Sequence, residues 1–204
     1  MPARRPRESP AERQQRRAAI DDPAVVLEAA ARFLEARSRS VVEVRRRLGR
    51  AGYRSELVEG AIARMTELGM LDDAAFGRAW LESRDRARPR GEIALRRELA
   101  LKGVDRATVD DLLEGRRAAA IAAASAEGGG DPVGGPDRAA ARRLLARHER
   151  ALARLTDPRQ RRQRAYALLA RNGFDPETCR EASAAVLTAP EASGADAEGT
   201  LADD

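Results

Sequence analysis

Apolar residues recur every three or four positions along most of the chain, which is the spacing of one face of an amphipathic helix. Three such faces come early, in residues 26–34, 41–51 and 57–68, and each predicts a helix. We expect Gly52 to end the second helix in a left-handed conformation and Ser55 to cap the third. The first part of the chain is therefore predicted to form a three-helix unit.

The same unit returns twice. Each copy carries a Leu, three further residues, a Gly and a large apolar residue, and the three sets are Leu48, Gly52 and Tyr53; Leu99, Gly103 and Val104; and Leu169, Gly173 and Phe174. They place the units at residues 24–71, 72–115 and 137–188. Repeated units of this length stack into linear arrays. The sequence thus predicts an all-α tandem array of three-helix, helix-turn-helix-like repeats, elongated or curved.

The flanks and one internal segment have a different composition. Residues 1–19 carry six Arg against two Glu, and residues 189–204 carry five acids and no base. Both have little apolar surface, so we expect a disordered basic tail and a disordered acidic tail. Residues 125–136 are rich in Gly and Pro and predict a flexible linker. After it, the third unit is expected to begin with one long helix, from about residue 138 to 155.

Composition changes the picture mainly by exclusion. Helix formers dominate and aromatics make up only 3%, which argues against sheets. One Cys and one His leave little for a disulfide, a metal site or a Ser-His relay. No apolar run approaches the ~20 residues of a membrane span. We expect a soluble, cytoplasmic, monomeric protein that is not an enzyme and holds no cofactor or metal.

Single residues with chemical potential have structural explanations. The repeat alignment places Trp80 and Cys179 at core positions and His148 at a rim position. Asp72 and Asp73 come just before an apolar helix, where helix capping accounts for them. No constellation of catalytic residues is left.

Basic charge is the remaining signal, with a formal net charge of +5. It gathers on or near the second helix of each unit, and a solvated helix face is the plain alternative for any one Arg. Scarce aromatics favour phosphate contacts over base stacking or base readout. The candidate filament- or DNA-binding residues are Arg46, Arg47, Arg50, Arg84, Arg86, Arg88, Arg90, Arg96, Arg97, Lys102, Arg159, Arg161, Arg162 and Arg164.

A motif at the junction of the first two units resembles a known family. Residues 69–76 match the Gly-x-Leu-Asp-Asp-x-x-Phe joint of the RecX family, and the match extends through Lys102, Gly103 and Val104. The first unit resembles the family's Ser-x-x-Glu-Leu element, with Val44 in place of the usual Leu. The resemblance covers residues 24–188. It departs from the family pattern in residues 88–91, where Gly-Pro is usual, and in the long linker.

The resemblance implies both a fold and a function. RecX proteins are tandem three-helix proteins that bind the RecA–DNA filament along its groove. They usually inhibit the recombinase, ATPase and coprotease activities of RecA, which places them in DNA repair, recombination and the SOS response. The expected partners are the RecA filament and, secondarily, single-stranded DNA, with no membrane. The residues by themselves support only an elongated basic helical binder, so a direct, largely non-sequence-specific DNA-binding protein and an adaptor for an acidic protein remain alternatives.

Overall fold

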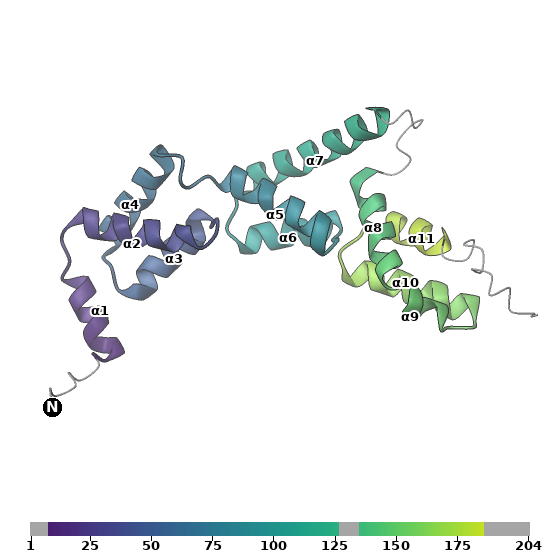
Figure 1. Ribbon diagram of the computed structural model, residues 1–204, viewed down its shortest axis with the longest axis horizontal. Coiled ribbons are helices and arrows are strands. Elements are labelled where there is room, and N and C mark those ends of the chain that lie inside the picture. The colour runs from purple at the N-terminus through teal and green to yellow at the C-terminus, as the bar shows by residue number, and fades with distance from the viewer. Residues whose placement is uncertain (1–7, 127–134, 186–204) are drawn as a thin grey trace, which may run out of the picture.

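The computed structural model describes residues 8–126 and 135–185, which form helices and no strand (Figure 1). In chain order these are α1 (Pro10–Ala18), α2 (Pro23–Glu35), α3 (Val41–Ala51), α4 (Ser55–Glu67), α5 (Asp73–Ala87), α6 (Glu92–Leu101), α7 (Arg106–Ala126), α8 (Gly135–Arg147), α9 (Glu149–Ala153), α10 (Pro158–Arg171) and α11 (Pro176–Ala185). Across the described ranges, no helix is both long and apolar enough to cross a membrane. The helices follow one another in an elongated row, as Figure 1 shows.

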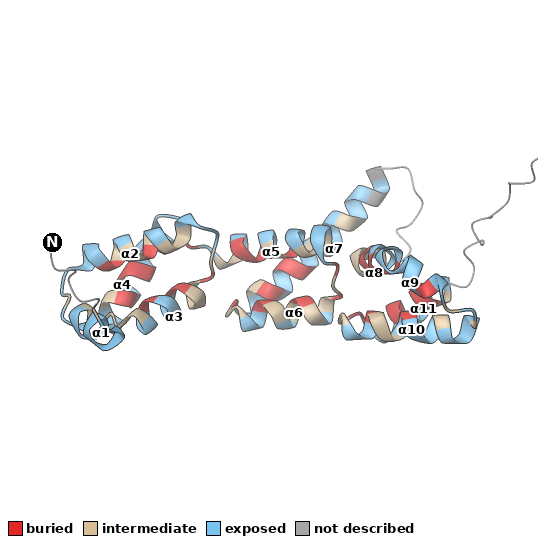
Figure 2. Ribbon diagram, turned by 60° about the horizontal axis from the view of Figure 1, so that its bottom comes forward, coloured by how far each residue is buried: buried red, intermediate tan, exposed pale blue. Residues whose placement is uncertain are grey.

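Each unit is held by an apolar core of its own (Figure 2). The first core lies among α2, α3 and α4 and contains Val44 and Leu48. The second lies among α5, α6 and α7 around Leu95 and Leu99, and the third includes Leu169 of α10. The three cores are separate clusters, made mostly of Leu, Val and Ala side chains with one Phe each in the second and third. The predicted fold class, an all-α array of three-helix repeats, is confirmed.

The repeated Leu-to-Gly signature has one structural role in all three units. Leu48, Leu99 and Leu169 are at most 2% exposed, and each anchors the second helix of its unit. The glycines that follow end these helices with φ of 99°, 82° and 78°. An L side chain rarely adopts this left-handed conformation, so the position favours glycine. Six residues further on, Val58, Val109 and Cys179 are buried.

The N-terminal segment differs from its prediction. Residues 1–19 are expected to be disordered, but residues 10–18 form α1. Ser9 Oγ accepts the amide of Glu12 at 3.2 Å, and Glu12 accepts the amide of Ser9 at 2.6 Å, while Pro10 occupies the first helical position. This capping box stabilises a helix that contains no buried residue. Residues 1–7 and the predicted acidic tail lie outside the described residues.

Three further boundaries shift. Ser55 is the first residue of α4 rather than its cap, since Arg54 precedes it without a side-chain cap. Helix α7 continues to residue 126, so the predicted linker overlaps α7 and α8 at its ends, and residues 127–134 lie outside the described residues. The long helix predicted for residues 138–155 is interrupted at His148, with φ −106° and ψ 7°. After this break, α9 places Leu152 in the third core.

The first and second units meet at the N-terminus of α3. Ser40 Oγ donates a hydrogen bond to the carbonyl of Lys102 at 2.6 Å. The carboxylate of Asp73, at the start of α5, accepts the amide of Val41 at 2.9 Å. Lys102 Nζ reaches back to Glu43 at 2.7 Å. The start of one unit's second helix thus rests on the turn and first helix of the next unit.

The second and third units meet in the same register. The amide of Gly91 donates to the carbonyl of Asn172 at 3.1 Å, and Asp137 accepts the amide of Glu92 at 2.7 Å. By the Leu-to-Gly alignment Gly91 is equivalent to Ser40 and Asn172 to Lys102; by the first-helix alignment Asp137 is equivalent to Asp73. The two joints therefore use equivalent positions, although the donor to the carbonyl is the hydroxyl of Ser40 in the first and the backbone amide of Gly91 in the second.

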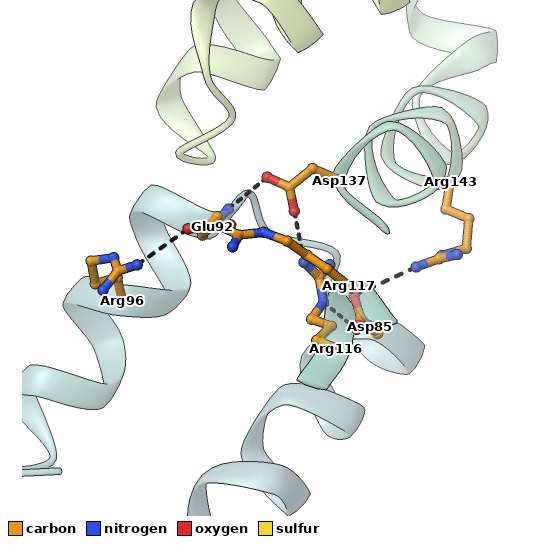
Figure 3. Close-up of polar contacts among 7 residues, drawn as sticks. All are labelled: Asp85, Glu92, Arg96, Arg116, Arg117, Asp137 and Arg143. Carbon is orange, nitrogen blue, oxygen red and sulfur yellow. Dashed lines mark hydrogen bonds and ion pairs between the residues drawn. The ribbon is translucent and has the colours of Figure 1, made fainter. Parts of the chain in front are cut away.

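The second joint also holds a buried Arg (Figure 3). The side chain of Arg116 of α7 is 8% exposed; its Nε and Nη2 bond Asp85 at 2.8 Å and its Nη1 bonds Asp137 at 2.7 Å. Burial works to lower the pKa of Arg116, but its hydrogen bonds to the two carboxylates raise that pKa above its ordinary value. Burial also raises the pKa of Asp137. One guanidinium thus connects α5, α7 and α8.

Candidate polyanion-binding surface

The second helices of the three units line one side of the array. Helices α3, α6 and α10 follow one another along the lower edge of Figure 2, with exposed residues on their outer faces. This arrangement follows from the repeated joint, which fixes the start of α3 and α6 against the next unit in the same way. Side chains at equivalent positions of these helices therefore recur along one side.

Neighbouring arginines on α3 and α6 differ in whether an acid of the same unit pairs with them. Arg45 of α3 bonds Glu59 at 2.6 Å, and the equivalent Arg96 of α6 bonds the equivalent acid, Asp110. The next residue in each helix, Arg46 or Arg97, is exposed and makes no ion pair or side-chain hydrogen bond with the described residues. Arg46 and Arg97 are therefore available to an external anion, whereas Arg45 and Arg96 are already neutralised.

On α3 the remaining candidates also face solvent. Arg50 is exposed and has no ion pair among the described residues. Arg47 is exposed, with its guanidinium 5.7 Å from the ring centre of Phe33. Arg39, which the sequence did not single out, lies over the same ring at 4.4 Å. The repeat alignment would have identified Arg39, because it is equivalent to Arg90, the residue before Gly91.

Around Trp80 the candidate charges are used by the fold itself. Trp80 is half-buried and packs against the edge of the second core, and its Nε1 donates to Glu98 at 2.9 Å. Arg84 lies 4.3 Å from the ring centre and bonds Glu98 at 2.6 Å, while Lys102 lies 4.8 Å from the ring centre. Arg90 contacts Glu98 as well. Since these cations are paired at the surface of the second unit, they contribute less net charge to an external ligand.

At the end of α5 two candidates remain free. The side chains of Arg86 and Arg88 are exposed and form no ion pair within the described residues. The backbone carbonyl of Arg86 accepts a hydrogen bond from Arg147 of the third unit at 2.9 Å. The backbone here is fixed to the third unit while the side chains point to solvent.

On α10 the predicted cluster divides. Arg161 is partly buried, and its Nη2 donates to the carbonyl of Leu155 at 2.9 Å, so its side chain closes the turn before α10. Arg159, Arg162 and Arg164 are exposed, with no ion pair in the described part of the chain. Three of the four arginines in this cluster are therefore free.

A groove beside α10 adds residues that the sequence analysis missed. It has a volume of about 970 Å³ and is lined by Arg164, Arg171 and His148, with Gln160 and apolar residues such as Leu155. Arg171 is exposed and is equivalent to Arg50 of the first unit. The repeat alignment would have found it, because both lie two residues before the left-handed glycine of their unit.

Metal and thiol chemistry find little support at this surface. The described residues contain no group of three His, Cys, Asp or Glu side chains placed to hold a metal ion. Cys179 is fully buried, and burial raises the pKa of its thiol, which disfavours the reactive thiolate. The arrangement is that of a charged contact surface. Eight candidates make no ion pair, side-chain hydrogen bond or ring contact with the described residues: Arg46, Arg50, Arg86, Arg88, Arg97, Arg159, Arg162 and Arg164.

Comparison with known proteins relates most of the chain to one family. A family model described as RecX, first three-helix domain, matches residues 27–65, and one described as RecX, second three-helix domain, matches residues 72–113. The chain is 31% identical to the regulatory protein RecX of Prosthecochloris aestuarii, over 76% of this chain and 89% of the relative. It is 30% identical to that of Mycobacterium ulcerans, over 78% and 82%.

The fold has solved counterparts. The crystal structure of RecX from Lactobacillus salivarius superimposes with a TM-score of 0.65, covering 81% of this chain and 97% of that one. Sequence identity in this superposition is 14%, so the structural similarity shows a shared fold and nothing further. Together with the two domain matches and the full-length relatives, it leads to one conclusion. The chain belongs to the RecX family of regulatory proteins.

Proposed function

We propose that this protein binds the RecA–DNA filament and inhibits the recombinase, ATPase and coprotease activities of RecA. It acts in the cytoplasm as a monomer, by binding and without catalysis of its own. Family membership supports a regulatory role. The proposal is carried by two arginines without ion pairs, Arg46 and Arg97. They lie at equivalent positions of consecutive units of an extended array.

The shape and the charge suit a nucleoprotein filament for a physical reason. A filament presents a regular series of negative charges, and an array presents cations at a regular interval. When one cation is in place, the next enters at a high effective concentration, because the joints hold successive helices in register. Free arginines on one side of an array thus bind a repeating polyanion more tightly than the same number scattered over the surface.

The test is ATP hydrolysis by RecA on single-stranded DNA, followed while the protein is added. We expect hydrolysis to fall as the protein approaches stoichiometry with RecA, and to recover at higher salt, where charge contacts weaken. Unchanged hydrolysis at a stoichiometric amount of protein would refute the proposal. Because free ATP is in excess in this assay, a loss of hydrolysis reports on the filament rather than on nucleotide supply.

Single-stranded DNA is the second candidate partner, and the free arginines of α10 favour it. Arg159, Arg162 and Arg164 are available for phosphate contacts, and Tyr166, beside Arg159 and Arg162, is a single exposed ring rather than a series of rings for base stacking. Binding to DNA alone is therefore expected to be weak, tolerant of sequence and steeply dependent on salt. Tight, sequence-selective binding without RecA would instead favour a direct DNA-binding function.

A further inference from the structure

In the second and third units, the turn after the second helix contacts the preceding unit, and it has the same form in both. It consists of the carbonyl just before the left-handed glycine and the glycine itself, as in Lys102–Gly103 and Asn172–Gly173. Each carbonyl accepts a hydrogen bond from the preceding unit. Each glycine is approached so closely that an added Cβ would lie 2.3 Å from Val42 Cγ2, or 2.4 Å from Ala94 Cβ. We call this surface the joint face.

The first unit has the same joint face, formed by Ala51 and Gly52, although no unit precedes it in the described chain. Its carbonyl is nevertheless used: Arg17 Nη1 of α1 donates to the oxygen of Ala51 at 3.3 Å. Its glycine is also covered, because an added Cβ on Gly52 would lie 2.7 Å from Cγ of Gln14 and 3.0 Å from its carbonyl oxygen. The two contacts of the joint face, to the carbonyl and to the glycine, thus recur with α1 in place of a preceding unit.

The remaining contacts of α1 are few and mainly polar. The guanidinium of Arg17 lies 5.7 Å from the ring centre of Tyr53, the residue after Gly52. Ile20, just beyond α1, packs against the first core. A nine-residue helix is marginal in water by itself, even with a good capping box. The helix therefore depends on the joint face for part of its stability.

We propose that α1 is a one-helix partial repeat that covers the joint face of the first unit, in the place that the second helix of a preceding unit would take. Residues 10–18 of the same chain are its occupant. End repeats of linear arrays need a polar cover, because an open end offers the same contacts that join the units. With α1 in place, the N-terminal end of the array is closed to other helices.

The opposite end of the array shows why a second copy is not the occupant. In the two internal joints, docking on the joint face uses the N-terminus of a second helix, at Ser40 and Gly91. The equivalent residue of the third unit is Arg161, which lies inside α10 because that helix begins earlier, at Pro158. The guanidinium of Arg161 is also turned back to Leu155. The third unit therefore has no free helix start to offer.

Hydrogen–deuterium exchange of the full-length chain tests the proposal. In the wild type we expect the amides of residues 13–19 to exchange about tenfold more slowly than in an unstructured chain, because docking holds α1. Gln14→Pro breaks α1 and is expected to remove this protection and to speed exchange at residues 50–54. Arg17→Ala is expected to do the same in part, and Arg13→Ala, at an exposed position of α1, to leave exchange at residues 50–54 unchanged.

Two results would overturn the proposal. The first is a lack of amide protection in α1 of the wild type, or an exchange rate at residues 50–54 that is the same in the wild type and in Gln14→Pro. The second concerns which copy supplies the helix, and light scattering of the same samples decides it. A wild-type dimer that becomes monomeric with Gln14→Pro would show that α1 covers the face of another copy, whereas a monomeric wild type supports the cover within one chain.

Discussion

Asp137, at the start of the third unit, accepts the backbone amide of Glu92 in the second unit at 2.7 Å. Asp73 accepts Val41 in the same way one unit earlier, at 2.9 Å. In each case an Asp at the start of one unit's first helix accepts a backbone amide at the start of the preceding unit's second helix. That amide has no partner within its own helix and would otherwise need water. This repeated contact gives the array its register and places the second helices on one side.

The buried guanidinium of the second joint gives the first prediction. Arg116→Met leaves Asp137 without its cation and leaves Asp85 with only the longer contact to Arg143, at 3.5 Å. We therefore expect the free energy of unfolding to fall by about 3–5 kcal/mol. Arg117→Met is the matched control, since Arg117 is 49% exposed and its ion pair with Glu92 is expected to contribute about 0–1 kcal/mol. Urea unfolding followed by circular dichroism measures both. Equal losses would show that burial of Arg116 does not matter.

Substitution of two left-handed glycines distinguishes the cost of backbone strain from the cost of a close contact at a joint. Gly103 and Gly69 have φ of 82° and 69°, and an added Cβ meets Val42 at Gly103 but nothing within 4 Å at Gly69. Ala at either position is expected to cost about 1–2 kcal/mol of backbone strain. Gly103→Ala should lose about a further 1–3 kcal/mol, because Val42 must move. Thermal unfolding compares the two variants, and equal losses would contradict the close contact.

Acidification should weaken the first joint through Glu43. Burial works to raise the pKa of this carboxyl, but the hydrogen bond and charge of Lys102 and the amide of Ser40 outweigh it and lower the pKa. A lowered folded-state pKa gives stability that is present above the unfolded value of about 4.5 and is lost as pH falls through the folded value. The wild type should therefore lose stability on acidification below about pH 4.5 more steeply than Glu43→Gln. Parallel urea midpoints for the two proteins would refute this role.

The sequence predicts the parts of this structure that repeat locally. The spacing of Leu48 and Gly52, found again at Leu99 and Gly103, identifies units and core because both depend on neighbours in the same helix pair. It does not predict the joints, where Asp73 meets Val41 through a contact between units. It also misses α1, whose capping box is local but whose helix lacks the apolar face that the periodicity detects.

For the candidate surface too, the sequence predicts local features but not contacts between helices. Charge along the sequence locates the basic helices, but Arg46 and Arg45 differ only in that Glu59 lies beside one of them in the fold. A partner on another helix leaves no signal at the Arg itself. The repeat alignment carries part of this information, since an acid recurs at Asp110 beside Arg96.

On α10 neighbouring arginines should have different effects. Arg161→Ala removes the bond to the carbonyl of Leu155 and is expected to lower stability by about 1–3 kcal/mol, with a smaller effect on binding. The double substitution Arg162→Ala with Arg164→Ala is expected to keep the melting temperature and to weaken binding to single-stranded DNA and to filaments. Melting curves and fluorescence anisotropy separate the two effects. Unchanged binding by the double variant would show that these arginines are only solvated.

The most direct test of the account compares two double variants in binding to RecA filaments on labelled single-stranded DNA. Arg46→Ala with Arg97→Ala removes two unpaired charges at equivalent positions. Arg45→Ala with Arg96→Ala removes two paired charges next to them, with the same change in net charge. We predict that the first double variant weakens filament binding by roughly tenfold and the second by much less. Equal weakening by both, or none by the first, would contradict a filament-binding surface built from the free arginines of successive units.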